Sequence, residues 1–187
     1  IPAQLWRRTV QWLIDWRDDL YWPYIWQLYW RKKLGIGDPG EEIAEEVAFL
    51  FAKAQNLRSE SKWEQAVGVY RYLRMLEPEH VRMLNHLGDT LLKLKKYRQA
   101  LALFDRAILI DPKYYSAYCN RGFAYVQLLR YDRALVDYDV AIALEKDKPE
   151  AYFYRAHTRL DITRSYIEAG DFSSASRSYQ QMQRDLL

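Results

Sequence analysis

Residues 81–114 read VRMLNHLGDTLLKLKKYRQALALFDRAILIDPKY, and their landmarks recur at a fixed step in the flanking sequence. Ala66, Ala100 and Ala134 lie 34 residues apart. The same step separates two sets of aromatic residues, two glycines and two prolines: Trp63, Tyr97 and Tyr131; Tyr70, Phe104 and Tyr138; Gly88 and Gly122; Pro78 and Pro112. Self-similarity at this period is typical of a solenoid of helical hairpins, whose extended surfaces hold other molecules.

The landmarks have physical roles within residues 81–114. An apolar stripe follows the first helix at Leu84, Leu87 and Leu91, and a facing stripe follows the second at Tyr97, Ala100, Phe104 and Ala107. Gly88 removes a side chain from the first helix, so the second helix approaches closely and Phe104 fills the gap. Pro112 ends the hairpin, because proline cannot continue a helix.

This pattern resembles the tetratricopeptide repeat family, whose landmarks are carried here by Leu84, Leu87, Gly88, Leu91, Tyr97, Ala100, Phe104, Ala107 and Pro112. The next repeat keeps the pattern except that Lys146 replaces the proline, and the preceding repeat is weaker in its first helix. The resemblance covers about residues 41–187. It implies an all-α, right-handed solenoid of about four hairpins, with repeats near 47–80, 81–114, 115–148 and 149–187 and with an N-terminal helical extension.

The last unit departs from the period. Phe172, Ala175 and Tyr179 lie 41 residues after their predecessors instead of 34, and two extra helical turns keep the apolar face nearly in phase. We expect one lengthened helix over about residues 150–169, followed by a turn at Gly170 and Asp171. This helix either caps the solenoid or projects as a contact for a partner.

The N-terminal region is rich in tryptophan. Six of the seven tryptophans fall before residue 31. Residues 1–34 are predicted to form an amphipathic helical leader and residues 35–40 a linker. The residues expected to anchor the leader are Trp12, Trp16, Trp22, Trp26, Trp30, Arg31, Lys32 and Lys33. Three roles fit it: a cap on the open end of the solenoid, an anchor in a partner protein, or a contact with a membrane surface.

The family resemblance also implies a binding surface, because in this family the first helix of each hairpin lines the concave face of the superhelix. Mapped onto this chain, the inward positions are Phe51, Gln55, Asn85, His86, Asp89, Cys119, Asn120, Phe123, Phe153, Tyr154 and His157. Amides can bond a peptide backbone and aromatic rings can cover its side chains. We therefore expect a protein or peptide partner, held on this face as an extended peptide or a helix.

Some members of the family hold the acidic C-terminal tails of heat-shock chaperones. They use Lys and Asn, then Asn, then Lys and Arg, from three consecutive repeats. In the last three repeats of this chain those places hold Asn85 and Asp89, then Asn120, then Glu150 and Tyr154, and the first three repeats match nothing. A carboxylate needs cations for charge-assisted hydrogen bonds, and Asp89 and Glu150 would repel it. Heat-shock chaperone tails are therefore not expected as partners.

Composition narrows the class of protein further. The net charge is only +3, and no aromatic-basic RNA motif is present, so nucleic acid is not an expected partner. The histidines and the single cysteine lack metal-ligand spacing, and there is no glycine-rich phosphate loop. We therefore expect no enzyme, cofactor or metal site. No signal peptide or membrane-spanning run is apparent, which favours an intracellular protein, either soluble or peripheral to a membrane.

Together these features predict a protein–protein interaction scaffold, or a structural or assembly subunit of a larger complex, either soluble or membrane-associated, with the leader as its anchor. Two alternatives remain open. One is a secretion-type chaperone that cradles an extended client, and the other is a peripheral membrane protein whose repeats are secondary.

Overall fold

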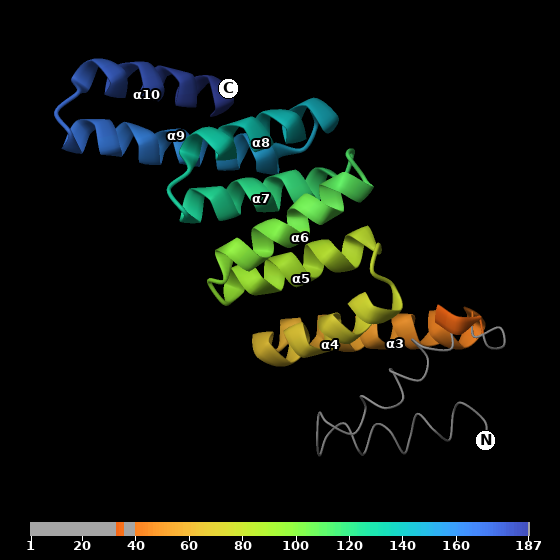
Figure 1. The fold of residues 1–187 in the computed structure, drawn as a ribbon. Coiled ribbons are helices and arrows are strands. Elements are labelled where there is room, and N and C mark those ends of the chain that lie inside the picture. The colour runs from red at the N-terminus through yellow and green to blue at the C-terminus, as the bar shows by residue number, and fades with distance from the viewer. Residues whose placement is uncertain (1–32, 36–39, 187) are drawn as a thin grey trace.

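The computed structural model describes residues 33–35 and 40–186 (Figure 1). The predicted leader residues Trp12, Trp16, Trp22, Trp26, Trp30, Arg31 and Lys32 lie outside the described residues, as does most of the linker. Lys33, the last of the predicted anchoring residues, is helical and exposed. None of the helices in the described ranges combines the length and the apolar character that crossing a membrane requires.

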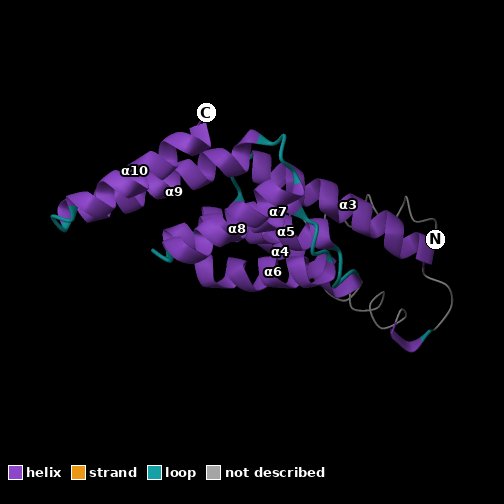
Figure 2. Cartoon of the chain, turned by 90° about the horizontal axis from the view of Figure 1, so that it is seen from above, coloured by secondary structure: helices purple, strands orange, loops and turns teal. Residues whose placement is uncertain are grey.

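The described helices pair into consecutive hairpins that stack from the α3–α4 end to the α9–α10 end (Figure 1). The pairs are α3 (Gly40–Ser59) with α4 (Trp63–Leu76), α5 (Val81–Lys93) with α6 (Tyr97–Ile110), α7 (Tyr115–Gln127) with α8 (Tyr131–Leu144), and α9 (Pro149–Glu168) with α10 (Phe172–Leu186). Short loops connect the helices, and the described chain holds no strand (Figure 2). The predicted all-α solenoid of helical hairpins is confirmed.

Close helix crossings follow from the glycines, as the sequence indicates. A Cβ atom added at Gly88 would lie 2.4 Å from Cε1 of Phe104, and one at Gly122 would lie 2.6 Å from Cε1 of Tyr138. Both aromatic side chains are fully buried. Each ring therefore occupies the space that a missing side chain leaves on the first helix of its own hairpin.

The turns inside the first three hairpins follow the 34-residue period, and the turn in the last hairpin comes seven residues later than that period. Ser61, Lys95, Leu129 and Gly170 all have φ between +57° and +75°, the left-handed conformation that ends many helices. The residue after each of them donates its backbone N–H to a carbonyl five residues earlier, at 2.8–2.9 Å. Only Gly170 is glycine, so the usual sequence signal for this turn is absent from the other three hairpins.

The outer hairpins differ from the repeat boundaries that the period predicts. Helix α3 begins at Gly40, ahead of the predicted boundary near residue 47. Helix α9 has 20 residues, against 13 in α5 and in α7, which confirms the lengthened helix expected over residues 150–169. Tyr179 on α10 is 46% exposed, although it corresponds to the buried Tyr138, so the last hairpin does not repeat the internal packing.

The apolar core falls into two clusters. The larger extends from Ile43 on α3 to Ala124 on α7 and includes most of α4, α5 and α6. The smaller consists of Tyr115, Cys119, Ala141 and Ala151, with Tyr118, Ile142 and Tyr154 packed against it. Helix α7 contributes to both clusters and is therefore the element that joins the two parts of the solenoid.

Candidate functional site

The candidate site is the surface formed by α3, α5, α7 and α9, which we call the first-helix face. All ten predicted binding residues lie on these helices: Phe51 and Gln55 on α3; Asn85, His86 and Asp89 on α5; Asn120 and Phe123 on α7; Phe153, Tyr154 and His157 on α9. They are not one continuous surface. The structure gathers them into a polar cluster at α3 and α5 and an aromatic cluster at α7 and α9, with an amide pair between.

The polar cluster is organised by Arg58 at the end of α3. Its Nη2 atom pairs with Asp89 on α5, and its Nη1 atom donates to Oε1 of Gln55 at 3.0 Å. The same Nη1 atom lies 2.7 Å from Nδ1 of His86. Phe51 covers one side, with its ring centroid 5.4 Å from that of His86 in an edge-on arrangement. Arg58 was not among the predicted site residues, yet it connects three of them.

The charge state of this cluster follows from its burial. Desolvation, followed by the nearby Arg58 cation, lowers the pKa of His86 from 6.5 to about 4. His86 is therefore neutral at pH 7, and Arg58 compensates the charge of Asp89. The polar cluster thus carries no net charge at neutral pH, although the sequence alone indicates an acidic position at Asp89.

An amide pair connects α5 to α7. Asn120 donates from Nδ2 to Oδ1 of Asn85 at 2.9 Å. Asn85 is only 6% exposed, so its side chain ties neighbouring hairpins together and does not face a ligand. Cys119 was also placed at an inward position and is likewise buried at 5% exposure, and burial raises the pKa of its thiol to about 11. A prediction of inward-facing positions from the repeat spacing alone therefore overestimates how accessible Asn85 and Cys119 are.

The aromatic cluster is the exposed part of the first-helix face. Phe123 on α7 is 37% exposed and Phe153 on α9 is 59% exposed. Tyr154 lies between them, with ring centroids 6.5 Å from Phe123 and 6.0 Å from Phe153, and its own ring stacks on Tyr138. His157 adds a fourth ring 6.1 Å from Phe153. Two exposed rings that contact the half-buried Tyr154, which itself stacks on the buried Tyr138, can anchor apolar side chains of a partner.

The His, Cys, Asp and Glu side chains of the described residues form no metal site. No group of three His, Cys, Asp or Glu residues among them is placed to hold a metal ion. His157 lies 3.7 Å from Asp161, one helical turn away on α9, and its side chain is 59% exposed. This contact is an ordinary solvent-exposed pair, which contributes little energy.

The fold and its periodic landmarks define a helical-hairpin solenoid, a class of protein that presents side chains on extended surfaces. Residues 88–128 match a family model described as a TPR repeat, and residues 41–107 match one for subunit 3 of the anaphase-promoting complex, or cyclosome. This chain is therefore a tetratricopeptide-repeat solenoid in its fold, with the repeat sequence itself matched over residues 88–128. Its fold is that of a protein–protein interaction module, and the models that match describe no catalytic domain.

Solved structures share the fold. The Arabidopsis OM64 TPR domain is 27% identical, with a TM-score of 0.59, and the match covers 62% of this chain and 95% of that one. MamA 41-end from Desulfovibrio magneticus RS-1 is 19% identical over 89% of this chain and 93% of its own, with a TM-score of 0.60. The second TPR domain of human RPAP3, in complex with an HSP70 peptide, is 21% identical over 63% of this chain and 98% of its own, with a TM-score of 0.60. No match was found among curated proteins.

Proposed function

We propose that this protein is a scaffold or assembly subunit that holds a peptide or a helix of a partner protein on its first-helix face. The aromatic cluster carries the proposal. Phe123 and Phe153 are exposed while Tyr154 beneath them is fixed by stacking on Tyr138, so the surface loses little side-chain entropy when a partner covers it. Large rigid rings at a packed base are typical of the residues that dominate binding energy.

The polar cluster supports recognition of a different kind. Gln55, His86 and Asp89 are held by Arg58 in one arrangement, and the neutral imidazole and the amide offer hydrogen-bonding groups without net charge. A peptide backbone, which carries donors and acceptors but no charge, is complementary to such a surface. We propose that one segment of the partner contacts both clusters, with its backbone at α3 and α5 and its apolar side chains at α7 and α9.

An acidic C-terminal tail is a poor fit to this face. RPAP3 domains bind HSP90 and HSP70 peptides that end in EEVD. In this chain the Arg58 cation is already paired with Asp89, and Glu150 and Tyr154 occupy the places where the family carries Lys and Arg. A carboxylate terminus would have to displace Asp89 to reach Arg58. We therefore propose a partner segment other than a heat-shock tail.

Photo-crosslinking tests the proposed face. A benzophenone amino acid replaces either Phe153 on the first-helix face or Leu109, which is 71% exposed on α6 and serves as the matched control. Both substitutions exchange one exposed apolar side chain for another. In the native cell we expect a defined adduct from position 153 and none from position 109. Equal adducts from both positions, or adducts from 109 alone, would contradict the proposal.

The tryptophan-rich leader is proposed as the anchor to the assembly or to a membrane surface. Its concentration of tryptophans and the Arg31-Lys32-Lys33 run support this role. The full chain and a chain lacking residues 1–32 can be compared for co-sedimentation with anionic vesicles and for recovery of partners. Loss of a large assembly on truncation, with the repeats still folded, supports the anchor. Identical recovery by both chains would leave the leader with a capping role only.

A further inference from the structure

The aromatic cluster on α9 lies between two carboxylates. Glu150 is in the first turn of the helix, Tyr154 and His157 follow it, and Asp161 comes one turn after His157. The steps between these residues are four, three and four, which places all of them on one side of the helix. Helix α9 therefore presents an acidic group before and after the exposed ring of Phe153.

Both carboxylates are available to a partner. Glu150 is exposed, and neither acid pairs with a lysine or arginine of the described residues. Oδ2 of Asp161 lies 3.7 Å from Nδ1 of His157, which is longer than a hydrogen bond. Burial, followed by nearby negative groups that include Glu150, raises the pKa of Tyr154. The aromatic rings are thus close to negative charge, although the whole chain carries a net charge of +3.

The equivalent positions on the preceding first helices are not acidic. Residues 34 and 68 positions before the two acids are Ser116 and Gln127 on α7, and Arg82 and Lys93 on α5. Helix α7 contacts both α5 and α9, so these positions follow one another across the first-helix face. The charge at the flanking positions therefore changes from positive at α5, through neutral at α7, to negative at α9. A segment that crosses the face meets carboxylates only at the aromatic end.

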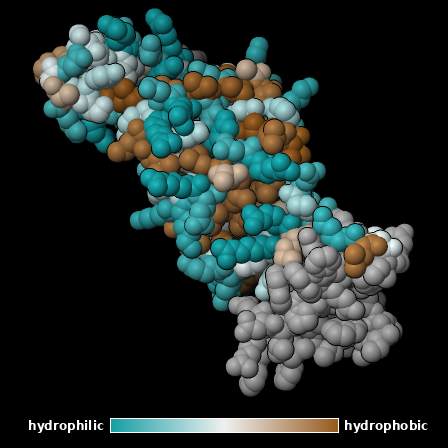
Figure 3. Space-filling model, in the orientation of Figure 1, coloured by the Kyte–Doolittle hydropathy of each residue, from teal (hydrophilic) through white to brown (hydrophobic). Residues whose placement is uncertain are grey.

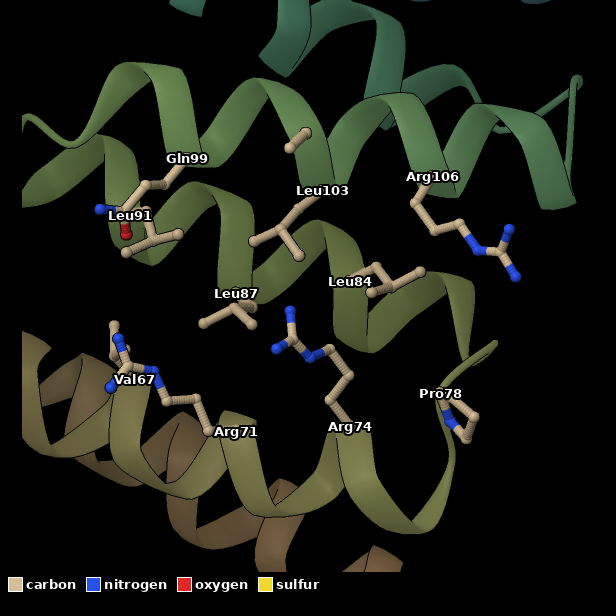
Figure 4. A pocket seen from close by; sticks show the side chains of 11 residues that line it. Val67, Arg71, Arg74, Pro78, Leu84, Leu87, Leu91, Gln99, Leu103 and Arg106 are labelled. Atoms are coloured by element: carbon tan, nitrogen blue, oxygen red, sulfur yellow. The ribbon is translucent and has the colours of Figure 1, made fainter.

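The hollow between α4 and α6, with a volume of about 540 Å³, differs in what it exposes (Figure 4). The leucines that line it are buried members of the core: Leu84, Leu87, Leu91 and Leu103. Arg71 and Arg74 at its edge are exposed but have no accessible apolar surface beside them. At the aromatic cluster, by contrast, Phe123 and Phe153 are themselves exposed. Of these two places, the aromatic cluster combines accessible apolar surface with charge.

We propose that the partner segment on the first-helix face carries basic side chains at the aromatic cluster, with apolar residues between them. An arginine or lysine there covers the rings with its aliphatic stem and places its cation against Glu150 or Asp161. A cation over an aromatic ring is also attracted by the ring itself. The two acids are eleven residues, or about 16 Å, apart on α9, so basic residues about five positions apart in an extended segment reach both. This pairing requires a peptide on the first-helix face and therefore rests on the proposed function.

Defined peptides and the full chain test the pairing. Each fluorescein-labelled peptide has about ten residues, with two leucines between a pair of arginines, glutamines or glutamates. Fluorescence anisotropy measures the three affinities. We expect the arginine peptide to bind at least about tenfold more tightly than the glutamine peptide, and the glutamate peptide to bind most weakly. Because the chain is net positive, attraction to its overall charge would give the opposite order.

Matched variants locate the effect. Glu150→Gln with Asp161→Asn is expected to reduce the preference for arginine over glutamine to about twofold or less. Glu64→Gln with Asp132→Asn removes the same two charges from exposed sites on α4 and α8, and it should leave the preference unchanged. Phe153→Ala should weaken binding of both peptides, because its ring contacts their leucines. Helical circular dichroism checks that each variant remains folded.

Two results would overturn the proposal. One is an arginine peptide that binds no more tightly than the glutamine peptide, and the other is an equal loss of preference in the two double variants. In either case, weaker binding of the glutamine peptide to Phe153→Ala would still support peptide binding on the first-helix face. If Phe153→Ala weakens binding of none of the peptides, the proposed function fails, and the pairing fails with it.

Discussion

At the scale of single residues, Gly88 and Gly68 lie in different surroundings in adjacent hairpins. A Cβ atom at Gly88 meets Phe104 at 2.4 Å, whereas nothing lies within 4 Å of one at Gly68 on α4. We predict that Gly88→Ala lowers the free energy of unfolding by about 1–3 kcal/mol through overpacking. Gly68→Ala should raise it by about 0.5–1 kcal/mol, because alanine favours the helix.

Urea unfolding of the two variants measures both effects against the wild type. The pair acts as its own control, since the side chain added is identical and only the surroundings differ. A shift of both midpoints in the same direction would contradict the role assigned to the close crossing.

His86 gives the protein a predicted pH dependence. Burial and the nearby Arg58 lower its folded-state pKa from 6.5 to about 4, with weaker influence from Arg82 and His80 and an opposing one from Asp89. Between pH 6.5 and 4 the unfolded chain therefore binds more protons than the folded one, so stability falls as the pH falls. Allowing for solvent screening of a half-buried group, we expect a loss of about 1–2 kcal/mol across this window.

The measurement is the free energy of unfolding in urea at several pH values, for the wild type and for His86→Asn. Other groups titrate in both proteins, so the difference between the two curves isolates His86. The variant should lose less stability than the wild type on acidification. Parallel curves would show that His86 is protonated equally in the folded and unfolded states.

At the scale of helices, the arginine bridge at α7 makes a second testable contrast. Arg121 contacts Asp105 on α6 and Asp137 on α8, and the Asp137 side chain is only 4% exposed. We predict that Arg121→Leu alone costs about 3–5 kcal/mol, because it leaves Asp137 buried without its partner. Leu87 and Leu103 occupy the equivalent positions 34 residues earlier. Arg121→Leu combined with Asp137→Leu should therefore cost no more than about 1 kcal/mol.

Thermal and urea unfolding of the single and double variants check this expectation. The double variant places leucines at the two buried positions where the hairpin 34 residues earlier has Leu87 and Leu103, so these helices have a known way to pack. A double variant that is as unstable as the single one would contradict the prediction, because it would show that the loss comes from something other than the unpaired Asp137 carboxylate.

The helices were largely predictable from the sequence, because the 34-residue period predicts each helix from α4 to α8 and the start of α9. The turns were not, since Ser61, Lys95 and Leu129 adopt the left-handed conformation without being glycine. Hydrogen bonds from the following residue hold them there, and the glycine that usually marks such a turn is absent at all three positions. The start of α3 at Gly40 also escaped the period, because no preceding repeat constrains it.

The candidate site was predictable in position but not in chemistry. Spacing assigned ten residues correctly to first helices, and it could not show which of them are exposed. Arg58 was missed because it lies beyond the inward landmarks of α3 and reaches the site through its long side chain. A basic residue one turn after an inward glutamine, opposite an acidic residue one repeat later, is the signal that could have found it.

At the scale of the whole molecule, the solenoid has two faces with different chemistry. The first-helix face presents neutral polar groups and aromatic rings, whereas the surface between α4 and α6 presents Arg71 and Arg74 above leucines that are buried in the core. Figure 3 shows apolar and polar surface interleaved along the stack, with no single dominant patch in that view.

The division of the core at α7 has a kinetic consequence. Cys119 sits in the smaller cluster where α7 meets α8 and α9, it is the single cysteine of the chain, and its buried thiol has a pKa of about 11. A thiol in this state reacts with iodoacetamide at neutral pH only when the joint opens and the thiolate forms. The rate of alkylation therefore reports how often the contact between α7, α8 and α9 opens. A partner that binds across α7 and α9 should lower that rate.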